Sequence, residues 1–429
     1  MALESPFDSG GVPLYLDTAS AAPVRREALE AAWPYLTGAF GNPSSHHEVG
    51  RTSADALKDA RRRVAKVLGM RSTDIIFTSG GTESDNLAII GIALGAGADG
   101  NAGSRGDAGF GGVAGFGGVA GFGGVADSGA ASYGRPARRH IVTSALEHEA
   151  VLAAADFLVR RHGFEITEVP VGPDGTITVE ALGSALREDT LLVSLGYANN
   201  EIGTVADIAA LARVAHDAGA FFHTDAVQAA GWLPLGGLGV DAMSLAGHKV
   251  GAPKGIGVAA IRARIPLEPL IHGGGQESGR RSGTENVALA VAFATALELA
   301  EAERTETAGR VQAIRDDFIA EVLATVPGAF LTGSESLRTP NHASFCFSGT
   351  SGEAVLLELE RLGVTASSGS ACAVGSDEPS HVLTGLGIDD DLAKTSVRFT
   401  FPADFTGEEG HRAAHAVSTA VKNLALSYT

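Results

Sequence analysis

The sequence predicts an α/β fold: a large domain with a mostly parallel, seven-stranded sheet, and a smaller α+β domain. The chain has 429 residues, of which 45% are hydrophobic, enough to bury more than one core. Up to about residue 300, short apolar runs alternate with longer helical patterns, which is typical of βαβ units. The order then changes, so we expect the large domain at 17–300 and the small domain at 1–16 and 301–429.

The large domain contains short β-branched or apolar runs that predict buried strands. Helices are expected between and before them, at 208–217 and at 51–68, where Leu57, Val64 and Leu68 share one apolar face. The predicted strands are 74–78, 140–143, 191–194, 220–224, 242–245 and 258–261.

The remaining third of the chain opens with residues 287–323, an alanine-, leucine- and glutamate-rich stretch with helical periodicity. It predicts one or two long helices. After it, we expect strands at 345–347 and 397–401 and helices at 353–362 and 408–424.

A glycine-rich insertion occupies residues 95–137 and holds three consecutive copies of GFGGVA at 109–126. Ordering so many glycines costs much backbone entropy, and one phenylalanine in six residues buries little surface in return. We therefore expect a disordered surface insertion without a chemical role, the alternative being a partner-binding loop.

The charge of the chain argues against several classes of partner. Lys and Arg number 32 against 50 Asp and Glu, a net charge of -18, which disfavours nucleic acid and anionic membranes. The N-terminus lacks the basic and apolar stretches of a signal peptide, and no apolar run approaches the roughly 18 residues that span a bilayer. We expect a cytoplasmic protein, in which Cys372 is a free thiol.

Three motifs follow predicted strands. TSGGTES at 78–84 leads into a helix, so the amides of Gly80, Gly81 and Thr82 suit a phosphate; an ordinary capped turn is the alternative. Asp225 and Lys249 each follow an apolar strand, in HTDAVQ and SLAGHK. Together they fit pyridoxal phosphate, which binds a lysine amine covalently and needs an aspartate to keep its ring nitrogen protonated.

Other candidate residues carry weaker signals. Lys254 is a rival lysine but follows Gly251 and Pro253, which indicates a loop. A histidine such as His148 could stack on a cofactor ring or transfer protons, although a lone histidine usually does neither. Cys346 alternates with phenylalanines in a strand pattern and is expected to be structural.

Cys372 lies in SSGSACAVG at 367–375, among small residues that offer no packing face. An inert, small hydrophobic residue is the simplest interpretation of such a cysteine. The flanking sequence of Cys372 argues against this interpretation. No CxxC or HExxH spacing indicates a metal site.

Taken together, the motifs resemble those of cysteine desulfurases of the NifS/IscS type, in family order across about residues 14–400. Ala246 departs from the pattern, since many relatives have a phosphate-binding serine there. The matching motifs are TSGGTESDN (78–86), ANNEIG (198–203), HTDAVQ (223–228), GHK (247–249), HGGGQE (272–277), RSGTEN (281–286) and SSGSACA (367–373).

The resemblance implies a fold-type I, pyridoxal-phosphate-dependent transferase of the class V aminotransferase family. Such an enzyme converts L-cysteine to L-alanine and leaves the sulfur as a persulfide on Cys372, with Lys249 and His148 as the other catalytic residues. Asn200 and Arg398 would bind the substrate. The cofactor would be bound by Gly81, Thr82, His148, Asn200, Asp225, Gln228, His248 and Lys249, and by Thr284 of the other protomer of a homodimer.

The resemblance also implies partners that accept sulfur, including iron–sulfur scaffold proteins and thiolation pathways. Two alternatives stay open at this point. A related lyase or aminotransferase would share the cofactor site but needs no mobile cysteine, and a non-catalytic sulfur-transfer scaffold would not need Lys249 and Asp225 together.

Overall fold

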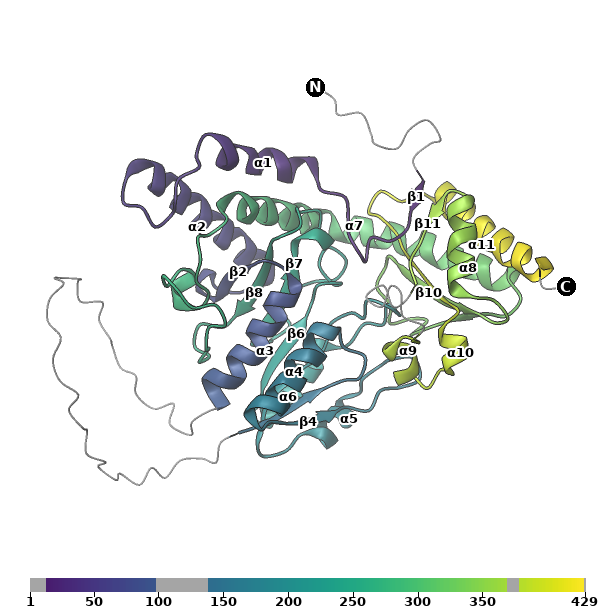
Figure 1. The fold of residues 1–429 in the computed structure, drawn as a ribbon, viewed down its shortest axis with the longest axis horizontal. Coiled ribbons are helices and arrows are strands. Elements are labelled where there is room, and N and C mark those ends of the chain that lie inside the picture. Colours follow the sequence, from purple (N-terminus) through teal and green to yellow (C-terminus); the bar gives the residue numbers. More distant parts are fainter. Residues whose placement is uncertain (1–12, 98–137, 369–377, 428–429) are drawn as a thin grey trace, which may run out of the picture.

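The computed structural model describes residues 13–97, 138–368 and 378–427 (Figure 1). The predicted insertion beyond residue 97 and Cys372 lie outside these residues. Within them, no helix combines the length and the hydropathy needed to cross a membrane.

The larger sheet has seven strands in the order β2-β8-β7-β6-β5-β3-β4. All neighbouring pairs are parallel except those of β8, which runs antiparallel to β2 and β7. The sequence prediction of a mostly parallel, seven-stranded sheet is therefore confirmed. The strands are β2 (Ile75–Thr78), β3 (His140–Thr143), β4 (Glu165–Glu168), β5 (Thr190–Ser194), β6 (Phe221–Asp225), β7 (Ala242–Ala246) and β8 (Gly257–Ile261).

Helices cover both faces of this sheet (Figure 1). Neighbouring strand residues point to opposite faces, so Val193 belongs to one hydrophobic core and Leu192 to the other. One face packs against α1 (Arg26–Thr37), α2 (Glu48–Leu68), α5 (Val179–Ala185), α6 (Ile208–Asp217) and the start of α7 (Val287–Thr325), and the other against α3 (Gly81–Gly97) and α4 (Glu149–His162).

The second sheet is antiparallel and has three strands, β9 (Ala329–Leu331), β10 (His342–Phe347) and β12 (Ser396–Thr400). Its core is rich in phenylalanine; Phe318 of α7 makes edge-to-face contacts with Phe345, Phe399 and Phe401. The elements around it are α8 (Gly352–Arg361), α9 (His381–Gly385), α10 (Asp390–Ala393), α11 (Gly407–Ser427) and the parallel pair of β1 (Leu14–Tyr15) with β11 (Val364–Thr365).

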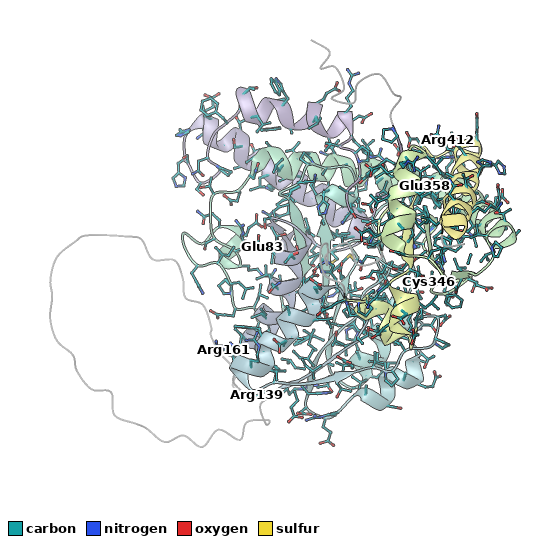
Figure 2. The ribbon with its side chains drawn as sticks, turned by 45° about the vertical axis from the view of Figure 1, so that its right-hand side comes forward. Glu83, Arg139, Arg161, Cys346, Glu358 and Arg412 are labelled. Carbon is teal, nitrogen blue, oxygen red and sulfur yellow. The ribbon has the colours of Figure 1, made fainter. Side chains whose placement is uncertain are left out.

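Helix α7 links the two cores, because its first part packs in the larger one and its last part in the phenylalanine-rich one. It is one continuous helix through residue 301, so the domain boundary expected there stays a prediction. Cys346 is fully buried, on the side of the molecule that holds α8 and α11 (Figure 2). Burial raises the pKa of its thiol to about 11, which confirms a structural role.

Candidate active site

A cavity of about 360 Å³ lies at the carboxyl ends of β6 and β7, where α3 begins and where Arg398 of β12 reaches the larger sheet. Two predicted site residues are absent from its walls: Thr284 is exposed, and Cys372 lies outside the described residues. The cavity does bring together Gly81, Thr82, His148, Asn200, Asp225, Gln228, His248, Lys249 and Arg398.

The turn between β2 and α3 is tightly packed. A Cβ on Gly81 would come within 3.0 Å of the Val227 side chain, so the backbone approaches its neighbours as closely as only glycine allows. The Ser84 hydroxyl donates to the Gly80 carbonyl at 2.9 Å, and the Glu83 carboxylate accepts from the Ser79 amide at 2.8 Å. Gly81 and Thr82 thus face the cavity at a helix N-terminus, which suits a phosphate.

Lys249 ends a short 3-10 turn, Gly247–Lys249, directly after β7. Its Nζ donates to the carbonyl oxygens of Ala19 and Ser20 at 2.5 and 2.8 Å. Burial and then the charges of Lys249 and Lys254 lower the pKa of His248 to about 4, so its imidazole is neutral near pH 7. Lys254 itself lies in an exposed turn, as its sequence context predicts.

Asp225 ends β6 beside Lys249, and its Oδ1 accepts the Val227 amide at 2.8 Å. The pKa of its carboxyl is raised, because desolvation outweighs the lowering effects of the Val227 amide and of the charges of His148 and Lys249. A buried carboxylate is stabilised by a nearby positive charge, and the protonated ring nitrogen of pyridoxal phosphate would supply one to Asp225.

His148 is fixed by the start of α4, because its Nδ1 accepts the Ala150 amide at 3.1 Å and so caps the helix. The neighbouring Glu147 is buried and accepts from the Ser144 hydroxyl and the Gly196 amide at 3.0 and 2.8 Å. Burial, as the largest cause, raises the pKa of Glu147 to about 8. No sequence pattern pointed to this wall residue except its place beside His148.

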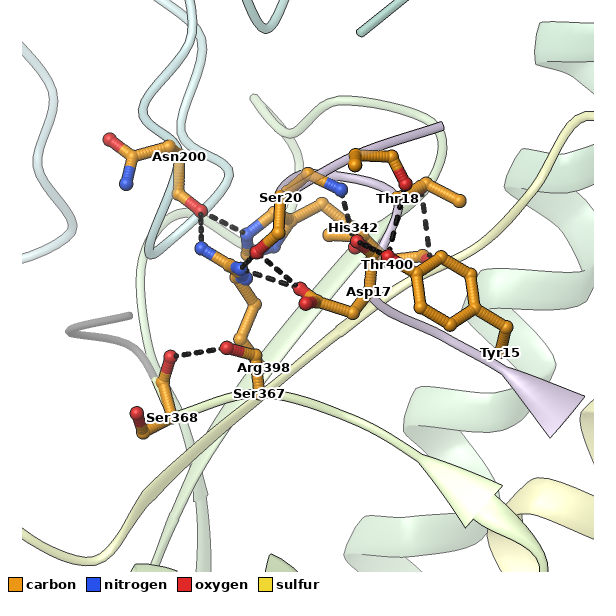
Figure 3. A network of polar contacts seen from close by, with 12 residues as sticks. Tyr15, Asp17, Thr18, Ser20, Asn200, His342, Ser367, Ser368, Arg398 and Thr400 are labelled. Carbon is orange, nitrogen blue, oxygen red and sulfur yellow. Dashed lines mark hydrogen bonds and ion pairs between the residues drawn. The ribbon is translucent and has the colours of Figure 1, made fainter. Parts of the chain in front are cut away.

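Arg398 is 2% exposed, lines the cavity from β12 and lies beside Asp17, Ser20 and Asn200 (Figure 3). Its two Nη atoms donate to the Asn200 carbonyl at 3.0 Å, to Asp17 at 2.7 Å and to the Ser20 hydroxyl at 2.9 Å. Among the described residues, its Nε has no hydrogen-bond partner although it is buried. Arg398 itself lines the cavity, and a guanidinium group is well shaped to bind a carboxylate ligand.

The segment that carries Cys372 is anchored beside this cavity on both sides. Before it, Ser367 and Arg398 exchange two backbone hydrogen bonds of 2.7 and 3.2 Å. After it, the Ser380 hydroxyl donates to Glu201 at 2.5 Å and His381 Nε2 donates to the Glu147 carbonyl at 3.0 Å. The sequence did not predict these anchors.

The wall residues fit pyridoxal phosphate. Lys249 supplies an amine, Asp225 a partly desolvated carboxyl group and the start of α3 a phosphate-binding helix end. The Arg398 side chain would bind the carboxylate of an amino acid.

Comparisons with known proteins agree with this fit. The family model "Aminotransferase class-V" matches residues 14–101 and 121–410, leaving out part of the glycine-rich insertion. The cysteine desulfurase IscS of Dictyoglomus turgidum is 41% identical over 398 residues, 92% of this chain and 91% of the relative. The cysteine desulfurase NifS of Azotobacter vinelandii is 40% identical over 418 residues, 96% of this chain and 93% of the relative.

Solved structures give the same result. A structure titled "NIFS-LIKE PROTEIN" aligns with a TM-score of 0.80 at 30% identity, covering 96% of this chain and 100% of that one. A second, "SspA in complex with cysteine", aligns with a TM-score of 0.73 at 30% identity, covering 91% and 99%. The fold is that of fold-type I pyridoxal-phosphate enzymes. The chain belongs to the class-V aminotransferase family, among the cysteine desulfurases, and its cofactor is pyridoxal phosphate.

Proposed function

We propose that this protein is a cysteine desulfurase, which converts L-cysteine to L-alanine and holds the sulfur as a persulfide on Cys372. The sulfur then passes to acceptor proteins for iron–sulfur cluster assembly or thiolation. One observation carries the proposal: a single cavity joins Lys249 and Asp225 to the side chain of Arg398. Bound pyridoxal phosphate supplies an electron-withdrawing ring that stabilises negative charge at the Cα of an amino acid.

Each residue of the cavity has a separate role in binding or catalysis. The Asp225 carboxylate holds a proton on the ring nitrogen, and the Lys249 amine anchors the cofactor and then moves the Cα proton of the substrate. Arg398 binds the substrate carboxylate, with Asn200 beside it. Gln228 contacts the ring, while Gly81, Thr82 and His248 hold the phosphate.

His148 has one ring nitrogen left for chemistry. Its Nδ1 accepts the Ala150 amide, so in the neutral imidazole the proton resides on Nε2. We assign the imidazole ring to stacking on the cofactor ring, and its Nε2–H to a hydrogen bond that positions the bound amino acid for proton transfer.

Cys372 can reach this site on geometric grounds. It follows Ser367 by five residues, and an extended chain covers about 3.5 Å per residue, so its thiol has a range of roughly 17 Å. The Ser367 backbone is hydrogen-bonded to the backbone of Arg398, and Arg398 lines the cavity. Within the cavity the thiolate attacks the substrate sulfur: an S–S bond forms as the substrate Cβ–S bond breaks, and the electron pair of that bond, with a proton, remains on the carbon skeleton that leaves as alanine. Cys372 then carries the persulfide out to an acceptor.

We further propose that the protein works as a cytoplasmic homodimer in which Thr284 completes the phosphate site of the partner. Thr284 is exposed, and its loop is held rigidly. Arg281 pairs with Glu83 at 2.8 Å, and Arg61 pairs with the buried Glu277 at 2.6 Å. Sedimentation of the wild-type chain tests the dimer, and faster cofactor loss from Thr284→Ala tests the shared site.

A Cys372→Ala variant tests the nucleophile. We expect it to keep the cofactor's visible absorbance but to form neither persulfide nor alanine in steady state. Cys346→Ala is the matched control, because Cys346 is buried in a small hydrophobic cluster and does not line the cavity, and it should still gain the mass of one sulfur on the Cys372 peptide. Full turnover by Cys372→Ala would refute the assignment.

A further inference from the structure

Asp85 is a buried carboxyl group to which the proposed function gives no task. It lies near the start of α3, is 1% exposed and lines the cavity. Its Oδ1 has no hydrogen-bond partner among the described residues, and the nearby His223 Nε2 is 3.8 Å away. An ionised carboxylate offers about four acceptor positions, so leaving it buried with so few donors is costly.

The other Asp85 contact belongs to a chain of hydrogen bonds beneath Asp225. Ser244 is the strand partner of Asp225, and its hydroxyl lies close enough to Asp85 to affect the pKa of that carboxyl group and 2.9 Å from His223 Nε2. His223 Nδ1 lies 2.9 Å from the Ser194 hydroxyl. Four side chains, Asp85, Ser244, His223 and Ser194, therefore form one buried row across β5, β6, β7 and α3.

The charges around this row favour one ionised carboxyl group. The negative charge of Asp225 raises the pKa of both Asp85 and Glu147. Of these three carboxyl groups, only Asp225 is stabilised by the positive charges of His148 and Lys249. Burial and the charge of Asp225 raise the pKa of Asp85 well above its usual value. Burial lowers the pKa of His223 to about 3, so His223 supplies no compensating charge.

We propose that Asp85 is a positioning residue that stays in its neutral, protonated form, donates to Ser244 and leaves Asp225 as the ionised carboxyl group under the cofactor ring. The direction of the row follows from this proton. The Ser244 hydroxyl oxygen accepts a hydrogen bond from protonated Asp85, so the Ser244 proton is donated to His223 Nε2. The proton of His223 is then on Nδ1, which donates to the Ser194 hydroxyl. An ionised Asp85 would reverse each of these bonds and place the proton on His223 Nε2.

The His223 tautomer is the first test, measured by nitrogen-15 NMR on the cofactor-free chain with labelled histidine and a His223→Gln variant for assignment. We expect the Nδ1–H tautomer in the wild type and in Asp85→Asn, whose amide also donates to Ser244. The Nε2–H tautomer in the wild type would overturn the proposal. This test needs no variant of Asp85 to fold.

Infrared spectroscopy is the second test. In Glu147→Gln at pH 7, a protonated carboxyl band should remain, and Glu147→Gln/Asp85→Asn should lose it. A Glu147→Gln spectrum without that band would overturn the proposal. Both measurements use cofactor-free protein, so they stand apart from the desulfurase activity.

The role toward Asp225 rests on the proposed function, because it requires the cofactor ring over that residue. In the holoenzyme, Asp85→Asn should leave the pH midpoint of the cofactor's absorbance change at its wild-type value, whereas Asp225→Asn should shift it. A shift in Asp85→Asn as large as that in Asp225→Asn would show that Asp85 carries a negative charge, and would contradict the inference.

Discussion

The two ends of the cavity are built differently. At the cofactor end, Asp225 and Lys249 follow two adjacent strands of one sheet, whose ladder pairs Asp225 with Ser244. At the substrate end, Arg398 comes from the three-stranded sheet and contacts Asp17 and Asn200, which are 381 and 198 residues away in sequence. The cofactor end is therefore fixed by one sheet, whereas the substrate end depends on how the two sheets meet.

The largest effect should come from the cofactor end, through Lys249→Ala. Because the lysine both anchors the cofactor and moves the Cα proton, we expect turnover to fall by about 10⁴-fold or more. Alanine release and the visible absorbance measure it. Lys254→Ala, in the exposed turn nearby, should stay within about twofold, since Lys254 does not line the cavity. Equal losses in both variants would contradict the choice of lysine.

Arg398→Lys probes the substrate end. A lysine cannot reproduce the fork of donors, and one charged hydrogen bond contributes about 1.5–3 kcal/mol, so KM for cysteine should rise about 10- to 100-fold. The amount of bound cofactor should not change, because Arg398 lies at the substrate end of the cavity and not at the cofactor end. Arg361→Lys on α8, an exposed position, is the control. Loss of cofactor from Arg398→Lys would show that the two ends are not independent.

Glu147→Gln tests the protonation of Glu147 through the pH dependence of the free energy of unfolding. The folded chain keeps a proton on Glu147 up to about pH 8, while the unfolded chain releases it near 4.5, so the folded state binds more protons in between. This group therefore makes the free energy of unfolding fall as pH rises through that window. Glu147→Gln should flatten the fall by at most about 1.4 kcal/mol per pH unit, as measured by denaturant unfolding.

Glu149→Gln is the matched control for this pH dependence, because Glu149 is exposed in the first turn of α4, two residues after Glu147. Its slope should equal that of the wild type. Identical slopes in Glu147→Gln and the wild type would mean that Glu147 is ionised in the folded protein.

The smallest effect is expected from Ala246→Ser, again at the cofactor end. Ala246 is buried in the cavity wall where many relatives have a phosphate-binding serine. A restored hydroxyl contact is worth about 1 kcal/mol, so cofactor release should slow about fivefold. Ala246→Val adds bulk without a hydroxyl and should not slow it. No change with serine would place the phosphate elsewhere.

The sequence predicts the cofactor end much better than the substrate end. Strands β6 and β7 are buried on both faces, so their apolar runs were predicted within a residue or two, and the residues following them share one sheet edge. No strand was assigned to β4, because Glu165–Glu168 is polar, partly exposed and at the sheet edge. The contacts of Asp17 with Arg398 and of Asp85 with Ser244 join distant segments, which no local pattern reveals.

The N-terminal segment pairs with segments of the chain that are synthesised much later. Strand β1 pairs with β11, Thr18 donates to the Thr400 carbonyl, and Ala19 and Ser20 receive the Lys249 ammonium. These partners are synthesised long after the first residues leave the ribosome, and contacts between such distant segments form slowly. Residues 14–20 must therefore wait, unpaired, until residues near 400 have been synthesised, and the pocket closes only then.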